Sequence, residues 1–573
     1  MSSLASQRLP RLQLRLLGRR RSHMFDVSPL MLLSLLGWTS LLVPIIGIKG
    51  ARFGGPAYIL FTLLWIAVIV VRFLRHREID TNLEFATIWT TTISLAYLAT
   101  SLGGANPAIL FAPLVIALSA VICRRYTVQS IFVLALLSGS YGTAAATFKV
   151  GVGPLIHLIL AGLWAGIIWR VVTKRRTRAL RAWPAMILVG VYMAVTLLEI
   201  TTAESFYIGI RSISVSQWYM LVFLVVAYTS LTSAELLKLG RLFVAVATAV
   251  GGYATMRHFT GPSAAESAYA FATGGNYNTL DGHTLSLFGS FGGRHDLAVW
   301  TSCAVPLCIG CALGWRDRWR YIAMLGAAFC VFDLIDTDVR AAIPAVLAGI
   351  VVTFALYALT PAFGRQRLGV AVISVSAVAA VGVALFLALG VNSNGHYTGL
   401  LHPTQDSSFS ERTYKWSGAI RDITHHPAGM GLGSAGRVHI QYGRFFLTSN
   451  ETIENSYLVI AYQEGFIVMS LFVLMLLAVL GTLAARTITT RSQAKATLAI
   501  GPVGALVSFM VMMMNGPYVE GIPALWIWLI LGLGVAQFAF RDPDSDPVPT
   551  DAEGPDAQRV LPEAAPPRVP AHV

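Results

Sequence analysis

Long apolar runs alternate with short polar segments over most of this chain, from residue 29 to residue 540. Many runs are long enough to cross the ~30 Å hydrocarbon core of a bilayer. Because backbone polar groups inside lipid must bond to one another, the pattern favours helices over strands. It predicts about sixteen membrane-spanning helices, centred near Leu36, Trp65, Ile93, Val115, Leu136, Leu163, Val189, Val225, Ala247, Ala304, Leu325, Gly349, Ala379, Leu474, Val507 and Trp528.

Composition supports the same fold class. The 573 residues are 55% hydrophobic and 12% charged, with a mean hydropathy of +0.66. A soluble domain carries about 25% charged residues, so this chain has too few charges to coat a water-facing surface. We therefore expect an all-α polytopic membrane protein. No cleavable signal peptide is evident, because the first 28 residues are basic and polar and the first apolar run leads into a second.

The net charge of +14 is arranged along the chain in a way that predicts topology. Lys and Arg are concentrated in short segments between alternate apolar runs, such as "TKRRTRALR" and "WRDRWR", whereas the long segments 258–293 and 392–455 carry few basic residues for their length. The positive-inside rule then places both termini in the cytoplasm and those two segments outside it. Since the positive charge follows the topology, we do not expect nucleic-acid binding.

These patterns divide the chain into five parts. We expect a basic cytoplasmic N-terminus (1–28), thirteen transmembrane helices (29–391), an extracytoplasmic catalytic loop (392–455), three further helices (456–540) and a disordered cytoplasmic tail (541–573). The tail is rich in Pro, Asp and Glu and has no aromatic residue. The five cysteines show no zinc or disulfide spacing, which indicates a role as small apolar filler.

Polar residues gather in four clusters on the predicted outer side, where a membrane protein's function is sought. In the first, "GSFGGRHDLAVW", Arg294, His295 and Asp296 open an apolar run. The glycines permit a tight turn before a helix whose first N–H groups favour an anion. An interfacial anchor is the alternative.

The second cluster, "DLIDTDVRAAIPAV", places Arg340 on the side where positive charge is normally depleted. One reading is an ion pair with Asp336 or Asp338. The other is a guanidinium that binds phosphate, which its planar fork of donors suits.

The third cluster extends from a polar stretch with helical character (411–424) into "HHPAGMGLGSAG". The stretch is too short and polar to span, so we expect it to lie along the membrane surface. The glycines after it permit backbone N–H groups to approach a ligand closely, although an ordinary loop explains them equally.

The fourth cluster is "ETIENSYLVIAYQEG", where Glu454, Asn455 and Tyr457 open the next apolar run. Such residues also occur as helix caps. Glu464, ten residues further on, is followed by Gly465. Either the span begins near Gly465, or Glu464 faces a polar cavity.

In order, spacing and sidedness these residues resemble the O-antigen ligase and Wzy-type polysaccharide polymerase superfamily, which includes bacterial O-oligosaccharyltransferases. The resemblance covers roughly residues 289–521 and implies a GT-C-like helix bundle with a large extracytoplasmic loop. Arg340, in "DVRAAIP", looks like the family's first outer arginine, and Arg412 and Trp416 fit its Arg-x-x-x-Trp element in "RTYKW".

The remaining motifs follow in family order. Gly429 and Gly431 lie in a Pro-x-Gly-x-Gly element, and "ENSYLVIAYQEG" resembles the His-Asn-x-Tyr-Leu motif that ends in Glu-Gly. Upstream, "SFGGRHDLA" is similar to the segment Phe-x-Asn-Pro-Asn-x-Leu-Ala. This chain departs from the ligases at Glu454, which stands where they have a histidine, so a polymerase or an unassigned ligase fits better.

The resemblance implies a metal-independent glycosyltransferase without a cofactor in a bacterial cytoplasmic membrane. Its donor would be a glycan on polyprenyl pyrophosphate, and its acceptor a hydroxyl of a glycan, lipid or protein. Arg340 and Arg412 would stabilise the developing negative charge, and Glu454 would be the general base. Substrate binding would involve Arg294, His295, Asp296, Trp416, His426, Gly429, Gly431, Asn455, Tyr457 and Glu464.

A transporter or flippase of a lipid-linked glycan is the rival class. It would be expected to have inverted repeats and charged residues near the middle of its spans. Here the strong charges lie at span ends and the outer loops are long, which favours the enzyme. A sensor or scaffold would normally carry a soluble domain, and we recognise none.

Overall fold

The computed structural model describes residues 119, 123, 126–148, 152–172, 184–229, 231–272, 279–280, 284–285, 287–364, 367–370, 407–437 and 453–539. Its elements, in chain order, are α6 (Thr127–Phe148), α7 (Gly153–Val172), α8 (Pro184–Leu198), η1 (Glu199–Thr202), α9 (Phe206–Val215), α10 (Gln217–Tyr228), α11 (Ser233–Thr260), α12 (Ala264–Ala272), β1 (Thr279–Leu280), β2 (Thr284–Leu285), α13 (Arg294–Gly314), α14 (Trp319–Asp336), α15 (Ala342–Leu359), η2 (Pro361–Phe363), α17 (Ser407–His425), α19 (Ser456–Glu464), α20 (Phe466–Thr489), α21 (Gln493–Met512), η5 (Met513–Asn515) and α22 (Ile522–Ala536).

The helical prediction is confirmed for the described part of the chain. Every predicted centre within that part lies inside a helix, and the remaining centres (Leu36, Trp65, Ile93, Val115 and Ala379) lie outside the described residues, as do segments 1–28 and 541–573. The exception to helix is the antiparallel pair β1–β2, which joins Thr279 to Leu285 within a predicted outer segment. Among the described residues, six helices are long and apolar enough to span a membrane, or seven if the bent pair α9–α10 counts as one span.

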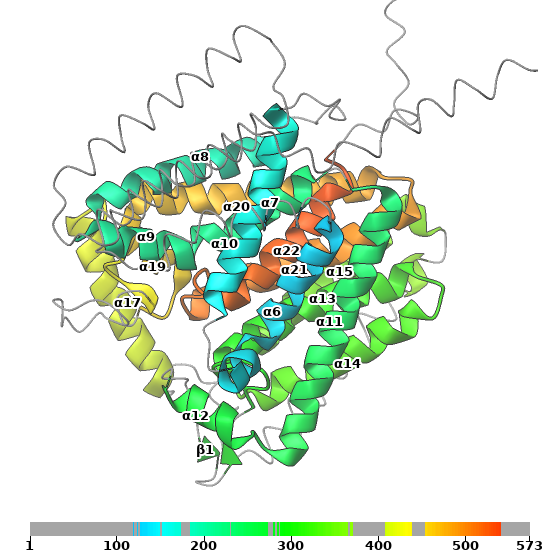
Figure 1. The fold of residues 1–573 in the computed structure, drawn as a ribbon, viewed down its shortest axis with the longest axis horizontal. Coiled ribbons are helices and arrows are strands. Elements are labelled where there is room, and N and C mark those ends of the chain that lie inside the picture. Colours follow the sequence, from blue (N-terminus) through cyan, green and yellow to red (C-terminus); the bar gives the residue numbers. More distant parts are fainter. Residues whose placement is uncertain are drawn as a thin grey trace, which may run out of the picture.

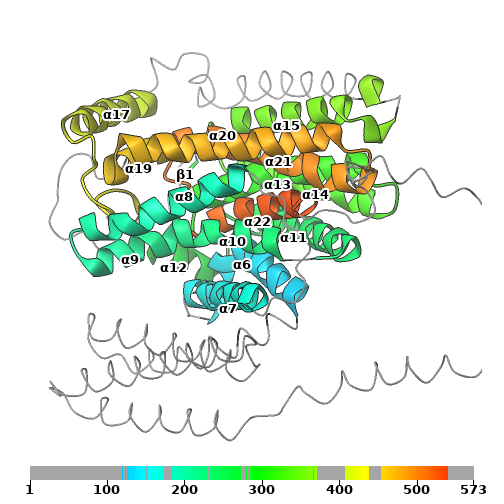
Figure 2. The ribbon, with the colours of Figure 1, turned by 90° about the horizontal axis from the view of Figure 1, so that it is seen from above.

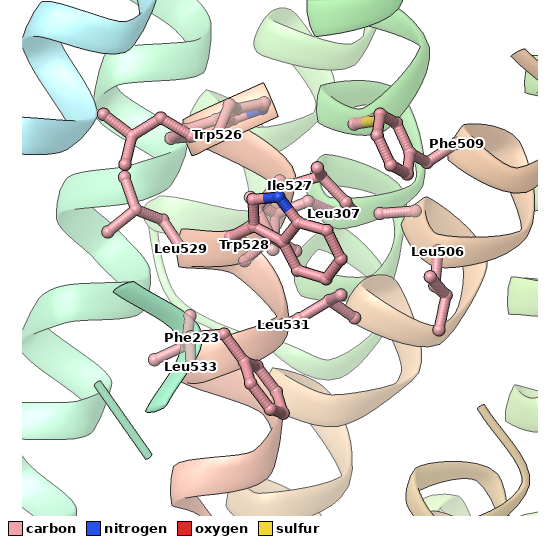
Figure 3. Packing of buried hydrophobic residues seen from close by; sticks show 14 of the residues in the cluster. Phe223, Leu307, Leu506, Phe509, Trp526, Ile527, Trp528, Leu529, Leu531 and Leu533 are labelled. Carbon is pink, nitrogen blue, oxygen red and sulfur yellow. The ribbon is translucent and has the colours of Figure 1, made fainter. Parts of the chain in front are cut away.

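Helix α13 lies at the centre of the bundle and packs against α14, α15, α21 and α22. Nearly all of its length is buried. Trp300 of α13 stacks on Trp526 of α22 with ring centroids 4.7 Å apart and an interplanar angle of 19°. Figure 3 shows Trp526 and Trp528 on α22 among leucine and phenylalanine side chains of the surrounding helices. Because these side chains pack closely, the core fixes the relative positions of the helix ends.

Glycines bring α13, α15 and α21 into backbone contact. A Cβ added to Gly310 would lie 2.7 Å from the backbone N of Gly501, and one added to Gly504 would lie 2.6 Å from the carbonyl O of Gly349. Real Cβ atoms do not approach other atoms so closely. We refer to α13, α15 and α21 as the glycine block.

Polar segments connect the helices at two opposite ends. One end carries the turn between α13 and α14, where Asp317 pairs with Arg241 at 2.5 Å. The other end carries the start of α13, the turn between α14 and α15, and the turn between α21 and α22. In Figure 1, α17, α19 and α12 gather on one side of the molecule, and Figure 2 shows α17 and α19 beside one end of α20.

The predicted helix at 411–424 is confirmed as the longer helix α17. The alternatives for Glu464 are also resolved, because α19 ends at this residue and α20 begins after Gly465, whose φ is 90°. The candidate span is α20, so it begins beyond Glu464.

Candidate active site

Three consecutive residues at the start of α13 reach three different partners. Arg294 donates from Nη1 to Oδ2 of Asp338 over 3.2 Å. His295 Nδ1 lies 3.0 Å from the hydroxyl oxygen of Tyr518, in the turn between α21 and α22. Asp296 is buried. The first turn of α13 is therefore the point at which the polar ends of several helices meet.

Asp296 accepts two hydrogen bonds that the sequence did not indicate. The hydroxyl of Tyr141, on α6, donates to Oδ2. The guanidinium of Arg437 donates from Nη2 to Oδ1 over 2.5 Å. Both carboxylate oxygens are thus engaged by protein groups.

The turn between α14 and α15 contains the predicted Arg340. Asp338 in this turn has a φ of 58°, a left-handed conformation that Asp tolerates better than most residues. Its carboxylate binds Arg294, while Asp336 lies 2.6 Å from His258 Nδ1. Arg340 is half-buried two residues after Asp338. The pair Arg294–Asp338 therefore ties this turn to the start of α13.

Arg412 and Glu454, predicted to be catalytic, form an ion pair. Nε of Arg412 lies 2.6 Å from Oε2 of Glu454, and Nη1 donates to Oδ1 of Asn515. The side chains are 24% and 33% exposed, respectively, so neither is fully buried. Helix α17 supplies the arginine, the residue before the cap of α19 supplies the carboxylate, and η5 supplies the asparagine.

The phenol of Tyr518 links this pair to the start of α13. Burial raises the pKa of Tyr518 above its usual value, the charge of Arg412 opposes the rise, and the charges of Asp296 and Glu454 increase it. These groups act on one phenol from α17, α13 and the N-terminal side of α19. Tyr518 lies 3.0 Å from His295 and follows Asn515, which binds Arg412, by three residues, so the predicted residues at these three places are gathered in one region.

Trp416 lies one turn after Arg412 on α17 and is half-buried. Its indole Nε1 is buried and has no hydrogen-bond partner among the described residues. An indole N–H in a partly buried place normally finds an acceptor. Trp416 thus places a half-buried ring one turn from Arg412, and its buried indole N–H makes no hydrogen bond within the described residues.

Residues 426–437, which follow α17 and which we call the glycine loop, form hydrogen bonds with the end of α19. Met430 N donates to Tyr462 O over 2.7 Å, and Gly431 N donates to Gln463 O over 3.0 Å. Gly429 N donates to the carbonyl O of His426, which is itself exposed. The N–H groups of both glycines are engaged within the protein, so they do not present donors to a ligand here.

The glycines permit this close approach. Gly429 and Gly431 have φ values of 87° and 100°. A Cβ on Gly429 would lie 2.5 Å from Gln463 O, and one on Gly431 would lie 2.4 Å from Thr202 O. Positive φ and backbone contact together explain the glycines.

The predicted site residues of α19 and its cap mainly hold this helix in place. Oδ1 of Asn455 accepts from the N–H groups of Tyr457 and Leu458 at 3.0 Å and 3.2 Å, which caps the helix. The hydroxyl of Tyr457 donates to Met510 O over 2.9 Å. Glu464 is buried and accepts from two other helices.

Sequence reasoning missed Tyr518, Glu520, Arg437 and Asn515. Three of these, Asn515, Tyr518 and Glu520, lie in "NGPYVEG", a polar break between the last two apolar runs, and a search for polar breaks on the predicted outer side would have found them. Arg437 is a basic residue on the side where such residues are depleted, a signal like that of Arg340.

Among the described residues, no group of three or more His, Cys, Asp or Glu side chains is arranged to hold a metal ion. Asp336 and Asp338 have the Asp-x-Asp spacing of some metal-binding pairs, but they bind different partners, His258 and Arg294.

Comparison with known proteins supports the family resemblance. Residues 323–473 match the family model Wzy_C, described as O-antigen ligase. A search of curated proteins gave no match. The matched segment includes Arg340, Arg412, Trp416, Glu454 and Glu464, while the start of α13 and the turn before α22 lie outside it. Residues 323–473 of this chain, whose apolar helices are typical of a multi-pass membrane protein, therefore match the O-antigen ligase family.

Proposed function

We propose that this protein transfers or polymerises a glycan at the outer face of the bacterial cytoplasmic membrane. The donor is a glycan on polyprenyl pyrophosphate, and the acceptor is a hydroxyl group of a glycan, lipid or protein. One observation carries the proposal: Arg412, paired with Glu454, bonds to Asn515, three residues before Tyr518, and the Tyr518 hydroxyl lies 3.0 Å from His295 at the start of α13.

The reaction forms one bond and breaks another. The acceptor oxygen attacks the anomeric carbon of the donor sugar, the bond from that carbon to the pyrophosphate oxygen breaks, and the acceptor's proton passes to Glu454. Oε2 of Glu454 binds Arg412, and Oε1 has no hydrogen-bond partner among the described residues. Oε1 is therefore the atom we assign to the acceptor hydroxyl. General base catalysis of this kind contributes about 10²- to 10⁴-fold to a rate.

The arginines stabilise the leaving group. As the pyrophosphate separates it gains negative charge, which guanidinium donors bind in charge-assisted hydrogen bonds. Arg412 and Arg340 take this role, and Arg294 adds positive charge at the start of α13. In this proposal no divalent cation is needed, and turnover of the purified protein in EDTA tests that point.

The other predicted residues bind and orient the sugars. Trp416 offers a ring face next to the ion pair, His426 is exposed at the end of α17, and His295 is held by Tyr518. We infer a role in shaping the site, not in direct contact with the sugars, for the predicted residues whose polar groups are engaged within the protein: Asp296, Gly429, Gly431, Asn455, Tyr457 and Glu464.

Deletion of the gene tests the proposal in cells. We expect long surface glycan to be lost while lipid-linked repeat units still reach the outer face, as shown by their accessibility to an external glycosidase. Repeat units trapped in the cytoplasm would instead indicate a flippase.

Two substitutions test the residues. We expect Arg412→Ala and Glu454→Gln each to lower the rate of glycan transfer by about 100-fold or more, because one removes a charge that stabilises the leaving group and the other removes the base. Purified protein with a lipid-linked donor gives the rate directly.

Glu411→Gln is the matched control. Glu411 precedes Arg412, is 66% exposed and pairs with Lys415 one turn away on the helix surface. We expect this variant to retain the wild-type rate. If both Arg412→Ala and Glu454→Gln retain activity while expressed normally, the assigned site is wrong.

A further inference from the structure

Residues 407–437 and 453–464 form a small unit beside the helix bundle, which we call the loop unit. It consists of α17, the glycine loop and α19. A small core holds α17 and α19 together and contains Ala419, Ile423, Ala435, Ile453, Val459, Ala461 and Tyr462, while Ile460 of α19 belongs to the core of the bundle. The bonds between the glycine loop and the end of α19 add to this core. The loop unit carries Arg412 and Glu454.

The other half of the proposed site belongs to the bundle. Arg294 and His295 lie at the start of α13, and Arg340 lies in the turn before α15. The geometry of the site therefore depends on how the loop unit is fixed relative to α13.

Several hydrogen bonds attach the loop unit to the bundle, such as those of Arg412 to Asn515 and of Glu464 to α8 and α10, and Arg437 adds an ion pair directly to the first turn of α13. Its Nη2 lies 2.5 Å from Oδ1 of Asp296, in the same helical turn as Arg294 and His295. Its backbone N–H donates to Oε2 of Glu520 over 2.6 Å, in the turn before α22. Among the described residues, this is the ion pair that joins the loop unit to the bundle.

Both partners of Arg437 are themselves held in place. Asp296 also accepts from Tyr141 on α6. Oε1 of Glu520 accepts a hydrogen bond from Nε2 of Gln463 over 3.3 Å, and Gln463 lies near the end of α19 in the loop unit. Arg437 thus lies between two acceptors that are fixed from α6, α13, α19 and the turn before α22.

The charges favour a permanently charged arginine at this place. Burial alone would lower the pKa of Arg437, but Asp296, Tyr141 and Glu520 raise it overall. Burial raises the pKa of Glu520, and the Arg437 N–H and charge oppose that rise. Removing one partner of a buried charge pair leaves the other uncompensated.

We propose that Arg437 is a positioning residue, which binds Asp296 and Glu520 and thereby places the ion pair Arg412–Glu454 opposite Arg294 and His295. The proposal rests on the proposed function. It also gives Asp296 a role: the carboxylate acts through Arg437 rather than through the substrate. A misplacement of about 1 Å between reacting groups lowers a rate by about 100-fold.

The test compares Arg437→Ala, Arg437→Lys and the control Arg421→Ala. Arg421 is an exposed arginine of α17, in the same unit. We expect Arg437→Ala to lower kcat by about 10- to 100-fold and to change the KM for the lipid-linked donor by less than about threefold, because binding groups remain while their alignment is lost. Arg437→Lys should recover part of kcat, since an ammonium also binds Asp296, and Arg421→Ala should match the wild type.

A measurement without turnover separates this inference from the proposed function. We expect hydrogen exchange in Arg437→Ala to be faster at the amides of 427–437 and at the start of α13, while the core of α21 keeps its protection. If the exchange rates change but neither the wild type nor any variant transfers glycan, the proposed function fails and the anchoring role stands.

A double-mutant cycle with Asp296→Asn completes the test. If Asp296 acts through Arg437, the double variant loses no more activity than either single variant. Additive losses, a loss confined to the donor KM, or unchanged exchange in Arg437→Ala would each overturn the proposal.

Discussion

Glu464 accepts hydrogen bonds from two helices that precede it by more than two hundred residues. Thr196 Oγ1 of α8 donates to Oε2 over 3.0 Å, and Gln217 Nε2 of α10 donates to Oε1 over 3.2 Å. Burial raises its pKa from 4.5 to about 8, against the effect of the Thr196 hydrogen bond. This carboxyl group is therefore largely protonated at neutral pH in the folded protein.

The raised pKa of Glu464 predicts a pH dependence of stability. Between pH 4.5 and about 8 the folded state binds a proton that the unfolded state has lost, so the free energy of unfolding falls as pH rises through this window. Glutamine keeps the shape without the ionisation. We expect the melting temperature of Glu464→Gln, relative to the wild type, to increase by on the order of 5 °C between pH 5 and pH 8.

Glu411→Gln is the control for this measurement. Its partner Lys415 lowers the pKa of Glu411, so this group does not titrate between pH 5 and pH 8. A difference between Glu464→Gln and wild type that stays constant over this range would contradict a protonated Glu464.

At the scale of elements, the glycine loop is the part most sensitive to a small change. Gly429 has a φ of 87° and contacts the carbonyl of Gln463. We expect Gly429→Ala to destabilise the loop by about 1–3 kcal/mol and to lower the rate of transfer, because the strain falls on the connection between α17 and α19. Melting curves and limited proteolysis of 426–437 measure the effect.

Gly190→Ala supplies the comparison. A Cβ at Gly190, within α8, would meet nothing within 4 Å. Alanine there favours the helix by about 1 kcal/mol, so the same chemical change should stabilise rather than destabilise. Equal effects at the two positions would remove the special role of Gly429.

The sequence predicted the helices because their length and apolarity follow from the membrane itself. It also identified α17, whose polar and apolar residues are mixed. It could not choose between the two readings of Glu464, because the break at Gly465 depends on the contact of that glycine with Pro427 and Ala428 in the glycine loop.

The sequence could not predict which polar groups pair with one another, and the reason is physical. Asp296 and Arg437 are separated by 141 positions, and their contact exists only when α13 and the loop unit are both in place. Family motifs indicated Arg412 and Glu454 but said nothing of their 2.6 Å contact. Short segments encode helices, whereas pairs across the site are a property of the whole chain.

At the scale of the molecule, the sidedness of the two polar ends stays a prediction that labelling can test. The five native cysteines are buried, so engineered ones report without background. We expect Thr424→Cys, exposed on α17, to react with a membrane-impermeant maleimide added to whole cells stripped of their outer layer. Arg316→Cys, exposed at the opposite end, should react only after the membrane is opened.

The reverse labelling pattern would place the proposed site in the cytoplasm, which would exclude an outer-face transferase. Reaction of both cysteines from outside would show instead that the cells leak. The accessibility of a cytoplasmic marker enzyme to an external substrate measures this leakage.

The glycine block also determines how a long substrate can enter and leave. Where the backbones of α13, α15 and α21 touch, no space remains for a lipid chain or a sugar to pass between them, and close packing prevents these helices from separating without loss of contact. On the proposed function, a glycan chain that reaches the site must therefore pass around the block and not between its helices.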